Sequence, residues 1–230
     1  MDLATLNVRI FADGADEAAI AELARDPRVS GFTTNPSLLH AAGVRDYAEF
    51  AKRILLLADD RPVSFEVLAD ELDEIEWQAG VIAGWGSNAV VKVPVTNSKG
   101  LSTMALVNKL AAGNIAVNVT AVMEAAQLEG LGLGVACYVS VFAGRIADTG
   151  RDAPSIIREI REERPNLGII WASPREVLNV IQAEACGCHA ITLTRDLIAK
   201  LPLLGKDLKA YSLETVQAFY RDAVLSRLTI

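Results

Sequence analysis

The sequence predicts an α/β fold, a single-domain (β/α)8 TIM barrel with an extra helix at its C-terminus. Two observations support this class: eight short runs rich in β-branched residues recur at fairly even spacing, and the stretches between them have helical periodicity. A length of 230 residues suits one barrel with short loops. A doubly wound open sheet is the alternative that fits the same alternation.

Each predicted strand is a short apolar run, and a longer stretch rich in Ala, Leu, Glu and Arg separates it from the next. No linker rich in Pro, Gly or Ser interrupts the pattern, so we expect one domain over residues 1–230. The eight predicted strands are residues 8–12, 31–34, 62–67, 89–95, 116–119, 135–139, 167–172 and 190–193.

Beyond the eighth predicted strand, the chain continues into a helical extension over about residues 207–230. We expect Ser212 to cap a final helix that carries Leu213, Val216 and Phe219 on one side. An amphipathic helix of this kind packs either on its own barrel or on a neighbouring subunit.

The composition excludes several classes of protein. With 51% hydrophobic and 22% charged residues, the chain can bury a sizeable core, unlike a disordered chain. Its 22 basic and 29 acidic residues give a net charge of −7, which argues against a nucleic-acid backbone or an anionic membrane as the main partner. The longest uncharged stretch, residues 130–144, is shorter than the roughly 18 residues that a membrane span needs.

The cysteines and the N-terminal sequence predict the compartment. Cys137, Cys186 and Cys188 are an odd number, and the chain does not begin with a basic segment followed by a long apolar one. We therefore expect a cytoplasmic protein with reduced thiols. Cys186, Cys188 and His189 have metal-binding side chains, but they lie in the predicted turn into the eighth strand, opposite the usual active site of a barrel. We expect a structural turn there and no metal.

A lysine within an apolar strand is the most informative residue. Lys92 lies between Val91 and Val93. Because successive side chains of a strand point to opposite faces, the valines would pack under the helices and Lys92 would point into the barrel. An unpaired buried ammonium is costly, and a lysine whose pKa is lowered by burial can attack a carbonyl as the neutral amine. The pattern therefore predicts Schiff-base chemistry.

Other predicted strands also end in polar residues, at the end of the barrel where active sites lie. Arg145 and Arg175 follow the sixth and seventh strands, where barrel loops often bind phosphate, so a phosphorylated substrate is favoured over two surface arginines in salt bridges. The residues directed inward near these strand ends are Asp13, Thr33, Asn35, Ser64, Glu66, Asn118, Thr120, Ser140 and Ser173.

Together these motifs resemble the transaldolase family, in particular its short single-domain members, a group that includes the fructose 6-phosphate aldolases. The resemblance spans almost the whole chain and rests on the order and spacing of the motifs. They are Phe11-Ala-Asp13-Gly14, Thr33-Thr-Asn35-Pro-Ser37-Leu, Val63-Ser-Phe-Glu66-Val, Val91-Lys92-Val-Pro-Val-Thr96, Asn118-Val-Thr120-Ala, Ser140-Val-Phe142-Ala-Gly-Arg145-Ile and Ala172-Ser173-Pro-Arg175.

The resemblance implies a role for each matching residue. Lys92 would form an iminium with the carbonyl of a ketose phosphate, and Asp13 would take the proton of the hydroxyl beside the scissile bond. Glu66 and Thr120 would hold and activate the water of imine formation and hydrolysis. No metal or organic cofactor is implied. The residues implied in substrate binding are Asn35 and Asn118 for hydroxyls, and Ser140, Arg145, Ser173 and Arg175 for the phosphate.

Two positions bear on the activity within this family. Glu66 and Phe142 resemble transaldolases, whereas fructose 6-phosphate aldolases typically carry Gln and Tyr there. We therefore expect transfer of a dihydroxyacetone unit between sugar phosphates, as in the pentose phosphate pathway. Release of free dihydroxyacetone is the alternative, and a non-catalytic barrel that binds a phosphosugar is an alternative of another class.

Two positions differ from the family pattern, and the family's usual assembly adds one more expectation. Val141 and Pro174 depart from the residues that the family usually carries in the predicted phosphate region, and Pro174 removes one amide donor. Short members of the family commonly form rings of five or ten subunits. The resemblance therefore implies a homo-oligomer, with the terminal helix around Val216 and Phe219 as its contact element.

Overall fold

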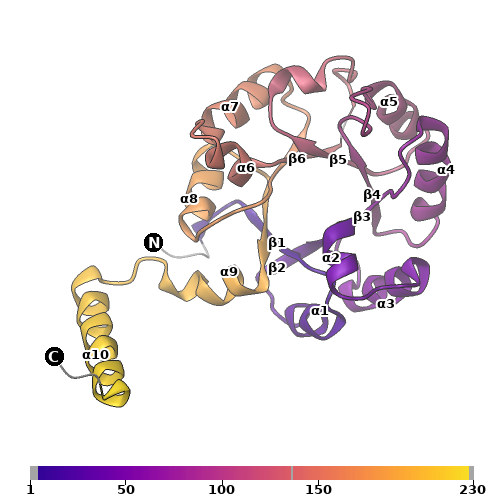
Figure 1. Cartoon of the computed structure of the whole chain (residues 1–230). Helices are drawn as coiled ribbons and strands as arrows, with labels where there is room; N and C mark the ends of the chain where they lie inside the picture. The colour runs from indigo at the N-terminus through magenta and orange to yellow at the C-terminus, as the bar shows by residue number, and fades with distance from the viewer. Residues whose placement is uncertain (1–4, 136, 228–230) are drawn as a thin grey trace.

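The computed structural model describes residues 5–135 and 137–227 of the chain. Eight parallel strands pair in sequence order, and β8 pairs with β1 to close a barrel (Figure 1). The predicted (β/α)8 barrel is confirmed, and the alternative of an open sheet is wrong. The strands are β1 (Arg9–Asp13), β2 (Val29–Thr33), β3 (Val63–Glu66), β4 (Ala89–Pro94), β5 (Val117–Val122), β6 (Tyr138–Val141), β7 (Gly168–Trp171) and β8 (Ala190–Thr194).

The observed strands differ from the predicted ones by a few residues at their ends. β6 begins at Tyr138 rather than at residue 135, because Val135 belongs to a turn in which its amide donates a hydrogen bond to the Gly132 carbonyl. β5 continues beyond residue 119 to Val122, and its pairing with β6 shifts register next to Ala121, whose φ is 62°. A register shift of this kind leaves no trace in a pattern of alternating hydrophobicity.

Helices surround the barrel (Figure 1). Several begin at a capping carboxylate: Asp46 accepts a hydrogen bond from the Glu49 amide, and Asp152 accepts one from the Ser155 amide. The α-helices are α1 (Glu17–Leu23), α2 (Pro36–Ala41), α3 (Tyr47–Ala58), α4 (Leu72–Ala83), α5 (Met104–Ala112), α6 (Ala143–Asp148), α7 (Ala153–Glu163), α8 (Leu178–Ala185), α9 (Arg195–Lys200) and α10 (Leu208–Ser226). Two 3-10 helices, η2 (Ala125–Leu128) and η3 (Leu201–Leu203), follow β5 and α9.

The main hydrophobic core lies between the outer face of the barrel and the helices. Val91, Val93, Val119 and Val139 belong to this core and are fully buried. Burying a valine side chain contributes about 1.5–3 kcal/mol, so this layer supplies much of the folding free energy. Each of these valines precedes or follows a residue that points into the barrel, as the strand pleat requires.

Two aromatic rings fill the barrel interior near the amino ends of the strands. Phe11 and Tyr138 meet edge to face, with ring centroids 6.1 Å apart, and pack with Ile170. Glycines on the neighbouring strands leave room for them: a Cβ on Gly31 would lie 2.8 Å from the Phe11 ring, and a Cβ on Gly168 would lie 2.8 Å from the Tyr138 ring. This apolar layer closes the barrel beneath the polar side chains at the carboxyl ends of the strands.

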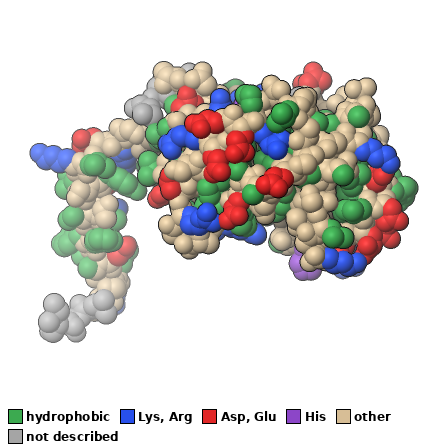
Figure 2. All heavy atoms as spheres, turned by 90° about the horizontal axis from the view of Figure 1, so that it is seen from above, with side chains coloured by type: hydrophobic (Ala, Val, Ile, Leu, Met, Phe, Trp, Pro, Cys, Tyr) green, Lys and Arg blue, Asp and Glu red, His purple; other side chains and the backbone are tan. Residues whose placement is uncertain are grey.

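The C-terminal helix α10 projects away from the barrel, and none of its residues is buried (Figure 1). Its N-cap is Asp207, whose carboxylate accepts a hydrogen bond from the Ala210 amide, so the prediction of Ser212 as the cap is wrong. The carboxylate begins the helix earlier than the apolar pattern alone indicated. Hydrophobic side chains cover much of its surface in Figure 2. Residues 228–230 of the predicted extension lie outside the described residues.

No helix within residues 5–135 and 137–227 is both long enough and apolar enough to cross a membrane.

A methyl group added at Gly168 tests the inner aromatic layer. We expect Gly168→Ala to lower the free energy of unfolding by about 1–3 kcal/mol, because its Cβ would push the Tyr138 ring out of the packed interior. Denaturant unfolding measures the change. Gly80→Ala is the matched control, because nothing lies within 4 Å of a Cβ at this position and alanine favours helix α4. Equal stability of the two variants would contradict this account of the interior.

Candidate active site

Lys92 and Glu66 form an ion pair inside the barrel. The pairing of β3 with β4 sets the two residues side by side, and Lys92 Nζ lies 2.9 Å from Glu66 Oε2. Lys92 also donates a hydrogen bond to the Thr34 carbonyl at 3.0 Å, and the residue is only 5% exposed. The amine is therefore held between a carboxylate and a backbone carbonyl at the carboxyl end of β4.

Asp13 lies at the end of β1 and is oriented by two threonines. The Thr33 hydroxyl donates to Asp13 Oδ1 at 2.8 Å, and the Thr33 and Thr192 hydroxyl oxygens are 2.5 Å apart. Because the single proton of Thr33 goes to Asp13, Thr192 is the donor in the second bond. Burial raises the pKa of Asp13 above its ordinary value, whereas the charge of Lys92 and the hydrogen bond from Thr33 act to lower it.

A second hydrogen-bonded chain crosses three strands. Ser140 Oγ donates to Asn118 Oδ1 at 2.8 Å, and Asn118 Nδ2 donates to Ser64 Oγ at 3.1 Å. All three residues are buried, so these bonds fix the Asn118 amide in one orientation. Thr120 follows on β5 and is also buried, but its Oγ1 makes no hydrogen bond within the described residues. A buried hydroxyl without a partner is costly, which favours a role in binding a polar group.

The strand ends enclose a cavity of about 110 Å³. Seven of the eleven predicted site residues line it, while Glu66 and Asn118 contact lining residues from the side. The Asn35 Oδ1 caps α2 by accepting from the Leu38 amide, so its Nδ2 is the donor left for a ligand. The lining residues are Asp13, Thr33, Asn35, Lys92, Ser140, Phe142, Arg145, Ala172, Ser173 and Thr192.

The loops after β6 and β7 meet at one side of this cavity. The Arg145 guanidinium lies over the Phe142 ring, 4.9 Å from its centroid. A Cβ on Gly144 would lie 1.6 Å from the Ser173 carbonyl oxygen, so only glycine allows this approach. Ser173 has a φ of 59°, a conformation that is costly for a residue with a side chain and that clusters at functional sites.

Arg175 lies away from the cavity. Its guanidinium pairs with Asp148, its amide donates to Asn179 Oδ1, and more than half of its side chain is exposed. Val141, one of the two departures from the expected pattern, is fully buried and lies outside the cavity lining. The predicted contact of Arg175 with substrate is thus not formed in this structure and stays a prediction.

Residues 10–228 match the model of the family described as Transaldolase/Fructose-6-phosphate aldolase. The chain belongs to this family.

Curated relatives agree with this family. A probable transaldolase of Streptococcus agalactiae serotype V is 36% identical over 212 residues, covering 89% of this chain and 95% of the relative. A probable transaldolase of Thermoplasma volcanium is 37% identical and covers 81% of this chain and 84% of the relative. The family and these names support an aldolase or transaldolase enzyme.

Solved structures with little sequence similarity share the fold alone. Dihydrodipicolinate synthase from Rhodopseudomonas palustris is 12% identical with a TM-score of 0.58, covering 97% of this chain and 81% of that one. Thiamine phosphate pyrophosphorylase from Pyrococcus furiosus is 13% identical with a TM-score of 0.56, covering 82% of this chain and 86% of that one.

Two groups in the candidate site were not predicted from the sequence. Thr192 was predicted only as part of a strand, although the alternation with Ile191 and Leu193, both fully buried under the helices, directs it inward. The Thr34 carbonyl was missed because a backbone acceptor carries no signal in the residue type. Both contact groups that the sequence did identify, Thr33 and Lys92.

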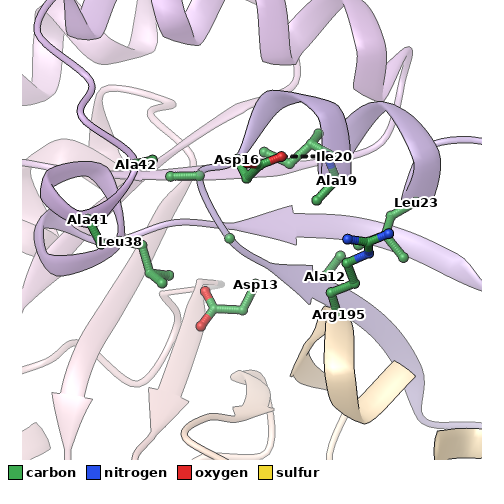
Figure 3. Close-up of a pocket in the computed structure, with 12 residues that line it drawn as sticks. Ala12, Asp13, Asp16, Ala19, Ile20, Leu23, Leu38, Ala41, Ala42 and Arg195 are labelled. Atoms are coloured by element: carbon green, nitrogen blue, oxygen red, sulfur yellow. Dashed lines mark hydrogen bonds between the residues drawn. The ribbon is translucent and has the colours of Figure 1, made fainter. Parts of the chain in front are cut away.

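A larger cavity of about 410 Å³ adjoins the site on the side of α1, α2 and α9 (Figure 3). Its walls are mostly apolar, with Ile20 and Leu23 from α1 and Leu38 from α2, and Arg195 lies at its edge. Asp13 lines both cavities, and in Figure 3 its carboxylate points toward the side of Leu38. Asp13 is therefore the boundary between the enclosed site and a more open apolar space.

Removing the Thr33 hydroxyl tests how Asp13 is tuned. We expect Thr33→Val to raise the pKa of Asp13 further, because the lost hydrogen bond stabilises the carboxylate. If Asp13 acts as a base, the acid limb of the kcat/KM profile then moves to higher pH. Thr192→Val should move it in the same direction by less, because Thr33 still donates.

Thr33→Ser is the control for this experiment, since it keeps the hydroxyl and should retain the acid limb of the unmodified enzyme. A limb that stays in place in Thr33→Val would contradict the assignment of Asp13 as the titrating base.

Proposed function

We propose that the chain is a transaldolase that transfers a dihydroxyacetone unit from a ketose phosphate to an aldose phosphate through a Schiff base on Lys92. The observation that carries this proposal is the Lys92 amine, which is held inside an apolar barrel by Glu66 and faces the cavity that Asp13 also lines. Membership of the family supports the reaction class.

The first step joins Lys92 to the substrate carbonyl. Glu66, 2.9 Å away, takes the proton that the ammonium must lose before the amine can attack. The carbonyl carbon forms a carbinolamine, and loss of water gives the iminium. The buried Thr120 hydroxyl, which lacks a hydrogen-bond partner among the described residues, is placed to hold that water together with Glu66.

The second step breaks a carbon–carbon bond. The Asp13 carboxylate takes the proton of the hydroxyl on the carbon next to the scissile bond. As the aldehyde product forms, the bonding electrons move into the iminium and leave an enamine on Lys92. In the reverse direction the enamine attacks an acceptor aldehyde, Asp13 returns the proton to the new hydroxyl, and hydrolysis frees the lysine. The raised pKa of Asp13 suits a group that must both take and return a proton.

The remaining cavity residues suit the rest of the substrate. Asn35 and Asn118 hold hydroxyls of the three-carbon fragment, Asn35 through its free Nδ2. Ser140, Ser173 and Arg145 line the side where the loops after β6 and β7 meet, which fits a phosphate. Arg175 joins them only if its guanidinium leaves Asp148.

Transfer is proposed over release of free dihydroxyacetone because of Glu66 and Phe142. Only a carboxylate can form the ion pair with Lys92, and Phe142 brings a ring without a hydroxyl to the cavity, under the Arg145 guanidinium. A barrel that only binds a phosphosugar has no use for this pair, since burying two charges costs free energy that apolar side chains would not. Transfer between sugar phosphates of the pentose phosphate pathway stays a prediction.

Borohydride trapping tests the Schiff base. With fructose 6-phosphate present, we expect reduction to leave a stable adduct that intact mass and peptide mapping place on Lys92. Lys92→Met is the matched variant, because it keeps the length and apolar stem of the side chain and removes the amine. We expect it to fold, to form no adduct and to lose measurable activity, because no amine remains in the cavity to form the iminium.

Either an adduct on another lysine or full activity of Lys92→Met would contradict the proposal. Product assays on the unmodified enzyme then separate the two reactions: transfer requires an acceptor aldose for turnover, whereas release accumulates free dihydroxyacetone without one. Phosphosugar binding without any adduct would favour the non-catalytic barrel.

We also propose that the chain forms a homo-oligomer, a pentamer or decamer, through α10 in the cytoplasm. Leu213, Val216 and Phe219 are 58%, 59% and 69% exposed on a helix with no buried residue. In proteins most of the stability of a helix comes from packing of its apolar face, so a second copy of the chain is the occupant that this face fits. The three cysteines are free thiols, as a reducing compartment requires.

The mass of the protein in solution tests the oligomer. We expect sedimentation to give a species of five or ten chains, and expect the double substitution Val216→Ser and Phe219→Ser to shift it to smaller species. Lys209→Ser, on the same helix, removes no apolar surface and should leave the mass unchanged. A monomer at micromolar concentration of the unmodified protein would contradict the proposal.

A further inference from the structure

Two of the three cysteines form a close pair at the end of the barrel opposite Lys92. Cys186 and Cys188 lie in the turn between α8 and β8, and their sulfur atoms are 3.8 Å apart. Both residues are buried, at 3% and 6% exposure. The proposed reaction uses neither thiol.

The end of helix α8 produces this arrangement. Cys186 is the C-cap, the Gly187 amide donates to the Glu184 carbonyl, and the Cys188 amide donates to the Ala183 carbonyl. This is the Schellman motif, which needs a left-handed residue after the cap, and Gly187 has a φ of 73°. The chain reversal brings together the side chains before and after the glycine.

Helix α7 adds positive charge to the turn. Arg161 Nη1 donates a hydrogen bond to the Gly187 carbonyl, and its guanidinium lies so close that a Cβ on Gly187 would be 2.9 Å from Nη1. The hydrogen bond from the Cys188 thiol lowers the pKa of Cys186, and the charge of Arg158 acts in the same direction against the effect of burial. The same hydrogen bond, with burial, raises the pKa of Cys188. Because the Cys186 thiol donates its own proton to the Ala183 carbonyl at 3.6 Å, Cys188 is the donor between the two sulfur atoms. We therefore assign Cys186 as the nucleophile, whose thiolate accepts this hydrogen bond, and Cys188 as the thiol that reacts second.

His189 does not complete a metal site with the two thiols. Its Nδ1 accepts a hydrogen bond from the Ile169 amide. Among residues 5–135 and 137–227, no group of three or more His, Cys, Asp or Glu side chains is arranged to hold a metal ion. Cys186 Sγ instead donates a hydrogen bond to the Ala183 carbonyl at 3.6 Å, and the two sulfur atoms contact each other at 3.8 Å.

We propose that Cys186 and Cys188 are a reversible oxidation site that hydrogen peroxide converts to an intramolecular disulfide. The Cys186 thiolate attacks one peroxide oxygen, which forms Cys186 sulfenic acid and releases hydroxide. The Cys188 thiol then attacks the Cys186 sulfur, which forms the disulfide and releases water. In total, two thiols lose two hydrogen atoms and one peroxide becomes two waters. To form this bond, the sulfur atoms approach each other from 3.8 Å to about 2 Å.

The burial of Cys186 favours a small oxidant over a large one. A thiol at 3% exposure admits a peroxide molecule more readily than a bulky disulfide such as oxidised glutathione. Cys137 is the internal comparison, because it is also buried but burial raises its pKa to about 11. Its thiol is therefore expected to react far more slowly with peroxide.

Mass spectrometry of the full-length folded protein tests the site. After removal of reductant and exposure to hydrogen peroxide, we expect the intact mass to fall by two hydrogen atoms, peptide mapping to link Cys186 to Cys188, and dithiothreitol to reverse the change. In Cys188→Ser, dimedone should trap a sulfenic acid on Cys186, whereas Cys186→Ser should show little trapping on Cys188. Cys137→Ser should behave as the unmodified protein does.

Three results would overturn the proposal. They are a disulfide that forms only after unfolding in urea, a disulfide that joins Cys137 or two different chains, and sulfenic acid trapped on Cys137 instead of Cys186. Because the readout is the mass of the protein, the outcome is independent of whether the proposed transaldolase reaction is correct.

Discussion

The candidate site depends on keeping one ammonium and one carboxylate together inside an apolar barrel. Lys92 and Glu66 are 6% and 14% exposed at the side chain and make direct contact. A buried ion pair adds little net stability, because the loss of hydration of both charges offsets most of their attraction. Loss of one partner alone costs about 3–5 kcal/mol, since it leaves a buried unpaired charge. The pair therefore adds little to the stability of the fold, and the rest of the fold must supply that stability.

The fold supplies that stability from two apolar layers. Outside the barrel, the valines beside Lys92 are fully buried under the helices, and inside it the Phe11 and Tyr138 rings close the lower half. The polar side chains lie at the carboxyl ends of the strands, above the inner apolar layer. Three of them, the carboxylates of Asp13 and Glu66 and the amide of Asn118, interact with a side chain on an adjacent strand. Asp13 bonds to Thr33, Glu66 pairs with Lys92, and Asn118 joins Ser64 to Ser140. Parallel register is thus what brings polar residues from separate βα units into one network.

The same βα architecture separates three groups of side chains in space. The amine and carboxylates lie at the carboxyl ends of the strands, while the thiol pair of Cys186 and Cys188 lies before β8 at the other end. The apolar surface of α10 lies outside the barrel altogether (Figure 1). The polar residues of the cavity lie at the strand ends, and the thiol pair lies at the C-cap of α8. The apolar surface lies along α10, which begins after its N-cap Asp207. We therefore expect a substitution at one of these places to have little direct effect on the other two.

The sequence alone predicted the βα repeat, the inward direction of Lys92 and most residues of the cavity, whereas the pairing of β8 with β1 decided between a closed barrel and an open sheet. The inward direction of Lys92 follows from alternation along one strand, since it lies between Val91 and Val93. Arg145 was predicted from its place after a strand, and Phe142 from the family resemblance. The sequence located the C-terminal helix but chose Ser212 over Asp207 as its cap, because several Asp and Ser residues can serve and only hydrogen bonding selects one.

Tertiary structure decided the pairings between elements. Hydrogen bonds link Thr192 through Thr33 to Asp13. Arg175 forms an ion pair with Asp148 away from the cavity, and Lys92 donates a hydrogen bond to the Thr34 carbonyl. Tertiary structure also set the sulfur atoms of Cys186 and Cys188 within contact across a left-handed glycine. The physical reason is that periodicity fixes the face on which a side chain lies, whereas its partner depends on register, loop path and the competition between neighbours for the same charge or proton.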